Sequence, residues 1–482
     1  MNKPTENIFA NKFGISDAVC KSLDIMGYHA PMPVQEQVIE NVQKNQDLIV
    51  KSKTGSGKTA AFGIPIIDTL DVEENAPQVL VLTPTRELAV QICEELTNIG
   101  RYKMIRCLPL YGKQPLHIQL QQLKQRVHVA VGTPGRVADL IDRGNLKLDQ
   151  IKYLVIDEAD ELLKTGFIDE IEDIIGQVPK QRTTMLFSAT MPKQIKSICN
   201  NYMQNPVRIE IESDQAPIDE IKQSFFEISE SQKYPKLKAL ILNLQPESCM
   251  IFCNTRAQVD EVADELQHDG ISCAALHGAM DQKYRLKAIN HFKEGDVTFL
   301  VATDLAARGI HIDHLDLVIN YSIPYDTENY VHRIGRTGRA GEKGHAISFV
   351  CNEEYKSWDS VEEFIGYKVP KGSDKIFTEN THKKPVNPNR INERKKELAS
   401  KRHQDIGKLR INAGKKKKIR PGDVLGALSN LPGIESHDIG IIDIQDTCTY
   451  IEIHNNKINL VCSELAKTTV KGKIVTVKKV SK

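Results

Sequence analysis

The sequence lacks the features that mark a membrane-spanning, secreted or disulfide-bonded protein. No run of about 18 consecutive apolar residues occurs in its 482 positions, and a membrane-spanning helix needs about that length. The ten cysteines include no CxxC pair, so we expect reduced thiols and neither a disulfide framework nor a zinc site. The first residues carry no apolar signal core. We therefore expect a cytoplasmic protein with no membrane partner.

The chain also lacks an overall excess of charge, but its two ends differ in sign. The formal charge of the whole chain at pH 7 is +1. Residues 371–482 contain 24 Lys and Arg against 12 Asp and Glu, so residues 1–370 carry a charge of −11. A basic segment on an acidic body indicates a polyanionic partner, although a solvated lysine-rich tail has the same composition.

Residues 47–59 contain the pattern around which the rest of the sequence is arranged. The apolar run Leu48–Val50 is followed by a turn with Gly55 and Gly57, by Lys58-Thr59 and then by a helical pattern. A strand, a glycine turn, Lys-Thr and a helix together form a loop that holds the phosphates of a nucleoside triphosphate. The two glycines let backbone N–H groups approach phosphate oxygens where a Cβ atom would collide.

The side chains of this loop predict a nucleoside triphosphate and Mg²⁺ as ligands. Lys58 can reach the β- and γ-phosphates, and the Thr59 hydroxyl can ligate Mg²⁺. Ser52 stands where the general pattern has its first glycine, which is a departure at one position. The nucleotide-binding prediction covers Ser52, Lys53, Thr54, Gly55, Ser56, Gly57, Lys58 and Thr59.

Two acidic residues and two arginines complete the predicted catalytic set, together with Lys58. Asp157 and Glu158 directly follow an apolar strand pattern. Asp157 can hold Mg²⁺, mainly through water, and Glu158 can polarise the attacking water. Arg336 and Arg339 belong to a run of arginines at a spacing of three and are suited to contact the γ-phosphate as arginine fingers. Each feature alone also occurs as a solvated helix start or as a basic surface turn.

Short β-branched runs alternate with helical patterns in two separate parts of the chain. This pattern indicates an α/β unit with a parallel sheet in residues 1–205 and a second such unit in residues 221–370. A hinge is expected between them, at 206–220. Residues 371–407 indicate a basic linker, and 408–482 a small module with the order β-α-β-β-α-β. The expected strands are 48–50, 79–82, 127–131, 153–156 and 184–187 in the first unit, 249–252, 273–276, 298–301, 317–319 and 346–349 in the second, and 409–411, 440–444, 450–453 and 473–480 in the module.

In combination, these motifs identify the chain as a member of the DEAD-box RNA helicases across nearly all of residues 9–365. The resemblance implies two tandem RecA-like domains followed by a small ferredoxin-like α+β domain of the RNA-recognition type. Gln35 matches the residue that reads adenine, because an amide donates and accepts at once. Ser188 and Thr190 match a triplet that couples hydrolysis to unwinding. The implied activity is ATP hydrolysis, stimulated by RNA and coupled to local unwinding of short RNA duplexes.

The same resemblance implies RNA contacts on both RecA-like domains. Hydroxyls, amides and guanidinium groups on loops suit sugars and phosphates rather than base edges, so we expect binding without sequence preference and a preference for RNA over DNA. The matching residues are Arg86, Thr133, Arg136, Arg285, Thr303 and Arg308. Two positions depart from the family. Lys113 replaces the second glycine of a doublet and could add a phosphate contact, and His311 replaces an Asp understood to contact the ATP ribose.

The C-terminal module is similar to the RNA-binding domain of the bacterial DbpA-type subgroup. The similarity rests on residues 412–420, 438–442, 450–453 and 468–473. The subgroup recognises a hairpin of 23S ribosomal RNA, which implies pre-50S particles as partners and a role in assembly of the large ribosomal subunit. A lysine run at the start of a helix is suited to hold RNA phosphates and comprises Lys415, Lys416, Lys417 and Lys418. We expect the protein to be a monomer.

Three other hypotheses fit parts of the sequence. An ATP-gated RNA clamp would use the same motifs without productive unwinding. A DNA translocase would share the two α/β units but would not distinguish RNA from DNA. The C-terminal module could instead bind a protein, because the fold alone does not set the ligand.

Overall fold

The computed structural model describes residues 7–51, 57–210, 221–307, 310, 312, 315–338, 344–377, 407–435 and 438–480. Within these ranges, no helix is both long and apolar enough to cross a lipid bilayer. Several predicted features lie outside the described residues, namely Ser52, Lys53, Thr54, Gly55, Ser56, Arg308, His311, Arg339, positions 211–220 of the predicted hinge and positions 378–406 of the predicted linker.

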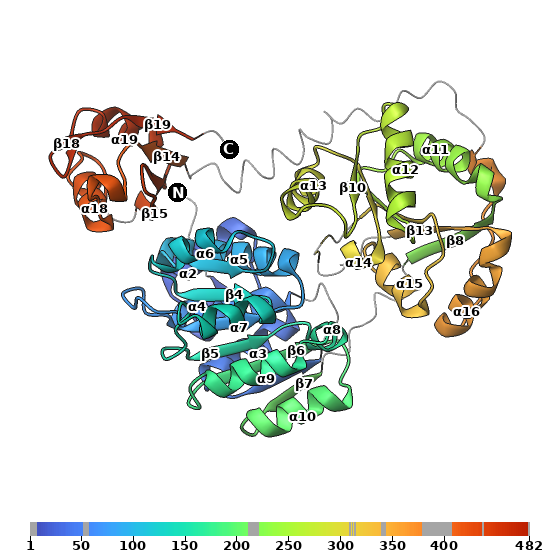
Figure 1. Ribbon diagram of the computed structural model, residues 1–482, viewed down its shortest axis with the longest axis horizontal. Helices are drawn as coiled ribbons and strands as arrows, with labels where there is room; N and C mark the ends of the chain where they lie inside the picture. The colour runs from blue at the N-terminus through green and yellow to red at the C-terminus, as the bar shows by residue number, and fades with distance from the viewer. Residues whose placement is uncertain are drawn as a thin grey trace. The chain divides into compact units, whose positions relative to one another are not determined.

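The first domain is built on a parallel sheet of seven strands, as the alternation of apolar runs and helical patterns predicts (Figure 1). The order across the sheet is β3-β4-β2-β5-β6-β1-β7. The strands are β1 Leu48–Lys51, β2 Val79–Leu82, β3 Cys107–Leu110, β4 Val129–Gly132, β5 Tyr153–Ile156, β6 Thr183–Ser188 and β7 Val207–Glu210.

Helices cover both faces of this sheet and form two separate apolar cores. Alternate residues of one strand enter different cores, so that Leu48 packs in the first core and Ile49 in the second. The first core is covered by α1 Ile8–Phe13, α2 Asp17–Met26, α3 Pro33–Gln43, α4 Lys58–Thr69 and α5 Arg86–Ile99. The second core is covered by α6 Leu116–Leu123, α7 Pro134–Asp142, α8 Ala159–Lys164, α9 Ile168–Gln177 and α10 Lys193–Tyr202.

Two strands of this sheet, β3 and β7, were not expected from the sequence. Both are edge strands and are only half buried, so neither shows the continuous apolar run of a central strand. Pro109 is tolerated in β3 because an edge strand has one unpaired side. Residues 207–210 were assigned to the hinge, and this was wrong, because they form β7 and pair in parallel with β1.

The second domain has a parallel sheet of six strands in the order β10-β11-β9-β12-β13-β8. Its edge strand β8 was missed for the same reason as β3 and β7, because its exposed positions interrupt the apolar run. The strands are β8 Ile221–Glu227, β9 Cys249–Phe252, β10 Cys273–Leu276, β11 Phe299–Ala302, β12 Leu317–Asn320 and β13 Gly344–Val350. The main helices are α11 Lys233–Leu244, α12 Arg256–His268, α13 Gln282–Glu294, α14 Asp304–Ala307, α15 Thr327–Ile334 and α16 Tyr355–Ile365.

The segment that follows α16 packs on the edge of this second sheet. Phe225 N donates to Pro370 O at 3.2 Å, and Gly372 N donates to Phe225 O at 2.8 Å. A Cβ atom at Gly372 would lie 2.0 Å from the Phe226 ring, so only glycine fits there. The described start of the predicted linker is therefore attached to the second domain.

The C-terminal module has an antiparallel sheet in the order β15-β16-β14-β19. The first and third strands, β14 and β16, lie side by side in the centre, with β15 and β19 at the two edges, which is the ferredoxin-like arrangement predicted from β-α-β-β-α-β. The elements are β14 Gly407–Ile411, α18 Pro421–Ser429, β15 Ile439–Ile444, β16 Thr449–Ile453, α19 Ile458–Leu465 and β19 Val477–Lys479. One expectation was wrong, because residues 473–480 do not form a single strand. Lys473–Ile474 form β18, which pairs with β17 Thr469–Val470, and the buried Val475 separates this hairpin from β19.

A buried carboxylate holds two loops of this module together. Asp438 is fully buried and accepts hydrogen bonds from Glu435 N at 2.8 Å, Lys457 Nζ at 2.7 Å and Asn455 Nδ2 at 2.7 Å. Burial alone would raise the pKa of Asp438, but these three donors outweigh it and lower the pKa to about 2. The loop before β15 is thereby fixed to the turn that precedes α19.

We predict that Asp438→Ala lowers the stability of the C-terminal module by about 3 kcal/mol, because Lys457 loses its buried partner. Hydrogen exchange of the full chain, followed by mass spectrometry, measures this as lost amide protection in β14 and β16. The folded-state pKa lies below the unfolded value of 3.8, so the stabilisation is present above pH 4 and is lost as the pH falls toward 2. Asp446→Ala, at an exposed position of the same module, is the control and should leave protection unchanged. Equal protection in both variants would contradict the role of Asp438.

Candidate functional site: the motif edges of two parallel sheets

The predicted motifs of the first domain meet at one edge of its sheet. The strands β1, β2, β4, β5 and β6 run parallel, so the residues that follow them lie along the same carboxyl edge. We call this carboxyl edge the motif edge of the first domain. It carries Lys58, Arg86, Thr133, Asp157 and Ser188. Residues that are more than a hundred positions apart in the sequence are thereby brought to one surface.

The described end of the phosphate loop is tied to the segment that contains Gln35. Gly57 has a φ of +73°, and a Cβ atom there would lie 2.2 Å from Met32 Cε and 2.7 Å from Gln35 Nε2. Gln35 is fully buried, its Nε2 donates to Gly57 O at 3.4 Å and its Oε1 accepts from Met32 N at 2.9 Å. Only glycine fits at position 57, and the Gln35 amide connects the two segments. Its pairing with adenine stays a prediction.

Two carboxylates follow β5 beside the start of α4. Asp157 and Glu158 are buried, as are Lys58 and Thr59. Asp157 Oδ1 accepts from Glu158 N at 2.9 Å, and Glu158 adopts the left-handed conformation with a φ of +50°. Burial raises the pKa of Asp157, and the Lys58 ammonium and the Glu158 N–H oppose that rise. A strained non-glycine residue beside a buried carboxylate is typical of a functional site.

The residues predicted to couple hydrolysis to unwinding contact the acidic motif directly. Asp160 Oδ2 accepts from Thr190 N at 2.9 Å and from Thr190 Oγ1 at 3.0 Å. Ser188 Oγ accepts from Asp160 N at 3.3 Å and donates to Thr190 O at 2.6 Å. The turn after β6 is therefore hydrogen-bonded to the start of α8. The role of Ser188 and Thr190 in coupling hydrolysis to unwinding stays a prediction.

In the second domain, a buried arginine connects four segments at the carboxyl edge of the parallel sheet, which is the motif edge of this domain. Arg333 is 1% exposed and forms a bidentate pair with Asp304, with Nη2 2.7 Å from Oδ2. It also donates to Asn254 Oδ1 at 3.0 Å, Asn320 Oδ1 at 3.2 Å and Ser322 O at 2.6 Å. No role was predicted for Arg333, although it belongs to the run of arginines at a spacing of three. Its partners follow β9, β11 and β12, so Arg333 fixes the loops of this edge relative to one another.

The other predicted residues of the second domain that the structure describes lie at the same edge. Arg336 is buried, and its Nη1 donates to Ile310 O at 2.6 Å. Arg285 approaches the carbonyls of His277 and Ala306 at 3.4 and 3.5 Å, and Thr303 follows β11. Their predicted contacts with ATP or RNA stay predictions.

The lysine run of the C-terminal module forms a short turn that is fixed from two sides. Lys415–Lys417 form a 3₁₀ turn just ahead of α18, at the start of the helix as expected. Lys415 N donates to Gln445 O at 2.9 Å. Lys471 Nζ donates to Lys418 O at 2.8 Å, and Lys473 Nζ to Lys417 O at 2.7 Å. The four lysines of the run, Lys415, Lys416, Lys417 and Lys418, are exposed.

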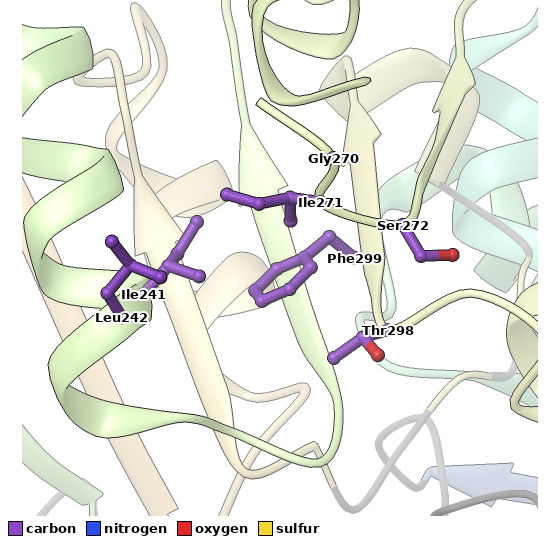
Figure 2. Close-up of a pocket in the computed structure, with 7 residues that line it drawn as sticks. All are labelled: Ile241, Leu242, Gly270, Ile271, Ser272, Thr298 and Phe299. Atoms are coloured by element: carbon purple, nitrogen blue, oxygen red, sulfur yellow. The ribbon is translucent and has the colours of Figure 1, made fainter. Parts of the chain in front are cut away.

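The second domain also has a small pocket (Figure 2), which lies away from the motifs of that domain. It is lined mainly by apolar side chains of α11 and of the residues that begin β10 and β11, including Ile241, Ile271 and Phe299. These are the amino ends of the strands, whereas the motifs follow their carboxyl ends. We therefore assign the functional site to the motif edges and not to this pocket.

We predict that Asp304→Ala destabilises the second domain by about 3–5 kcal/mol, because it leaves the buried Arg333 charge without a counter-ion. Trp358 is the only tryptophan of the chain and packs on Phe225 and Tyr330 in this domain, so its fluorescence reports urea unfolding there. The control is Asp359→Asn, which breaks an exposed ion pair with Lys368 and should cost less than about 1 kcal/mol. Similar unfolding midpoints for the two variants would show that the Arg333 network does not hold this edge together.

Comparisons with known proteins match the whole length of the described fold. The profile for the DEAD/DEAH box helicase matches residues 32–198, the helicase conserved C-terminal domain matches 232–341, and the DbpA RNA binding domain matches 408–479. The ATP-dependent RNA helicase DbpA of Bacillus subtilis (strain 168) is 46% identical over 473 residues, which cover 98% of this chain and 99% of the relative.

Other relatives resemble the two larger domains. The DEAD-box ATP-dependent RNA helicase CshA of Geobacillus kaustophilus (strain HTA426) is 44% identical over 358 residues, 74% of this chain and 77% of that protein. The structure of S. cerevisiae Dbp5 bound to RNA and ADP BeF3 matches with a TM-score of 0.67 at 28% identity, over 81% of this chain and 99% of that one. The chain thus belongs to the DEAD-box ATP-dependent RNA helicases, and its C-terminal RNA-binding domain makes it one of the DbpA type.

Proposed function

We propose that this helicase unwinds short RNA duplexes next to a hairpin of 23S ribosomal RNA, during assembly of the large ribosomal subunit in the cytoplasm. The observation that carries the proposal is the rigid basic turn of the C-terminal module. A turn whose backbone is fixed by Gln445, Lys471 and Lys473 presents its lysines in one arrangement, which suits a structured RNA better than an unstructured one. In this proposal the protein acts as a monomer, and its own C-terminal module directs the two helicase domains to the RNA.

The motif edge of the first domain is suited to ATP with Mg²⁺. The donor set consists of a hydroxyl and a buried carboxylate, which are the oxygen ligands that Mg²⁺ prefers. Thr59 would hold the ion directly and Asp157 mainly through water, and the ion would neutralise charge on the phosphates. Burial raises the pKa of Asp157, and a bound cation would lower it again by stabilising the ionised form.

Hydrolysis requires groups from both domains in this proposal. Lys58 holds the phosphates, and Glu158 orients and polarises the attacking water. Arg336 and Arg339 contact the γ-phosphate when the two domains close on ATP and RNA. The closed domains bend the bound strand so that it no longer fits a duplex, which opens the duplex locally. Loss of phosphate reopens the domains and releases the strand.

We predict that Glu158→Gln lowers RNA-stimulated ATP turnover by about 100-fold or more, because the amide cannot accept a proton from water. RNA binding in the presence of ATP should persist, since the amide keeps the size of the carboxylate. A coupled ATPase assay and fluorescence anisotropy with labelled RNA measure the two properties. Glu161→Gln, one turn further along α8, serves as the control and should keep the turnover of the unmodified chain. Turnover that survives in Glu158→Gln would remove this residue from the mechanism.

We predict that ribosomal RNA stimulates the ATPase at concentrations about 100-fold lower than unrelated RNA, because the module raises the local concentration of neighbouring duplexes. The assay compares total ribosomal RNA, a hairpin-bearing 23S fragment and unrelated RNA, for the full chain and for a chain without residues 404–482. The truncated chain should respond equally to all three. A full chain that makes no distinction would contradict the ribosomal target.

The same hairpin fragment with an attached short duplex separates unwinding from simple clamping. Displacement of the strand at the rate of ATP turnover supports the helicase cycle described above. Retention of the RNA with ATP but without displacement would support the clamp. Equal stimulation by DNA and RNA of matched sequence would instead support a DNA translocase.

A further inference from the structure

We propose that Gln223, Ser348 and Asn320 are positioning residues for Arg336, because together they fix the helix that leads to it. These three side chains come from three neighbouring strands of the second sheet, β8, β13 and β12. The inference rests on the proposed contact of Arg336 with the γ-phosphate, and it adds groups that act only through that arginine.

This row of polar side chains lies where the sheet is otherwise apolar. Asn320 and Ser348 are fully buried and pair with each other in register, and Gln223 on the adjacent strand is also buried. Their neighbours two positions away on the same face, such as Ile221 and Ala346, are apolar and belong to the core that α15 covers. A buried polar group costs free energy unless it is hydrogen-bonded, so this row requires partners.

An unbroken chain of hydrogen bonds runs along the row. Arg333 Nη1 donates to Asn320 Oδ1 at 3.2 Å, and Asn320 Nδ2 donates to Ser348 Oγ at 3.1 Å. The Ser348 hydroxyl donates to the Tyr330 side chain, whose own hydroxyl donates to Gln223 Oε1 at 2.9 Å. Tyr330 and Arg333 both belong to α15 and lie three residues apart, on neighbouring turns of the same face. The row therefore holds this helix at two points.

Directional bonds at two points fix a helix in a way that apolar contacts do not. Apolar attraction has no preferred direction, whereas a hydrogen bond weakens steeply when its angle changes. α15 ends at Ile334, and Arg336 follows two residues later. A rotation or shift of α15 would therefore move the Arg336 guanidinium, and a misplacement of about 1 Å can lower a rate about 100-fold.

Strand β8 also contacts the turn that follows Arg336. Gly338 has a φ of +69°, and a Cβ atom there would lie 2.7 Å from Ile221 Cγ1. A side chain at position 338 would collide with β8 and strain the backbone, so glycine suits this turn. Ile221 and Gln223 lie on the same face of β8. One strand thus contacts the segment before Arg336 through Tyr330 and the segment after it through Gly338.

Gln223 is the member of the row that can be changed with the least damage to the fold. It lies on the edge strand, and its Nε2 donates to Tyr367 Oη at 2.5 Å, where Tyr367 is only partly buried. A substitution at Gln223 removes a link to α15 and leaves Arg333 with its own partners. Gln223→Met keeps the length of the side chain and removes both polar groups, whereas Tyr330→Phe removes only the hydroxyl at the other end of the link.

The test measures ATP turnover of the full chain with a saturating single-stranded oligoribonucleotide. We expect Gln223→Met and Tyr330→Phe each to lower kcat about tenfold, because the arginine is displaced and not removed. The KM for ATP and the affinity for the oligoribonucleotide should stay within about twofold, since ground-state binding does not need the exact position of Arg336. The double variant should be no slower than the slower single variant, because both changes remove the same link.

Two control variants and a folding measurement accompany the test. Tyr367→Phe removes the outer bond of Gln223, Lys222→Gln changes an exposed residue of β8, and both should keep kcat within about twofold. Trp358 packs edge-on against Tyr330 with 5.6 Å between the ring centroids, so its fluorescence during urea unfolding shows which variants are folded in the assay. Whichever of Gln223→Met and Tyr330→Phe is folded decides the question. An unchanged kcat there, or an equal fall in Tyr367→Phe, would overturn the positioning role.

Arg336→Gln separates this inference from the proposed function. It should lower RNA-stimulated turnover about 1000-fold, as expected when an arginine finger is lost. Full turnover in Arg336→Gln would contradict the proposed contact with the γ-phosphate, and the positioning role would fall with it. Loss of turnover in Arg336→Gln together with full turnover in Gln223→Met would overturn the positioning role alone.

Discussion

The direction of the strands is the constraint on which the functional site depends. In a parallel sheet every strand ends at the same edge, so each loop that follows a strand reaches a common surface. In the first domain this edge carries the described end of the predicted phosphate loop, the carboxylates, the turn predicted to couple hydrolysis to unwinding and the predicted RNA contacts. The second domain repeats the arrangement with a different set of residues. Neither domain needs a deep pocket, because the ligands are an elongated nucleotide and an RNA strand.

Networks of buried polar groups hold these loops in fixed positions relative to one another within each domain. Removing charges from water is costly, so a buried group such as Arg333 is stable only while all its partners are present. Its bonds to Asp304 and to the loops after β9 and β12 therefore fix several loops at once. In the first domain, Asp160 fixes the turn at Thr190 in the same way, by accepting a hydrogen bond from its backbone N–H. Each network holds the loops of its own edge together within one domain.

The sequence predicted the strands that lead into the motifs, because these strands are continuous apolar runs. The run before Lys58 and the one before Asp157 are buried strands, and both appear where they were expected. The edge strands β3, β7 and β8 were missed, because a half-buried strand has no continuous apolar run. Arg333 was not recognised as a structural residue, since its partners lie up to 79 positions away. The split of residues 473–480 depends on the burial of Val475, which no local pattern shows.

The central claim is that ATP and RNA together close the two RecA-like domains. Single-molecule energy transfer tests it most directly, with one dye on each domain attached at an engineered non-natural residue. The distance is recorded without ligand, with an ATP analogue, with RNA and with both. We predict one short distance that is populated only when both ligands are present. The same distance distribution in all four states would contradict the account.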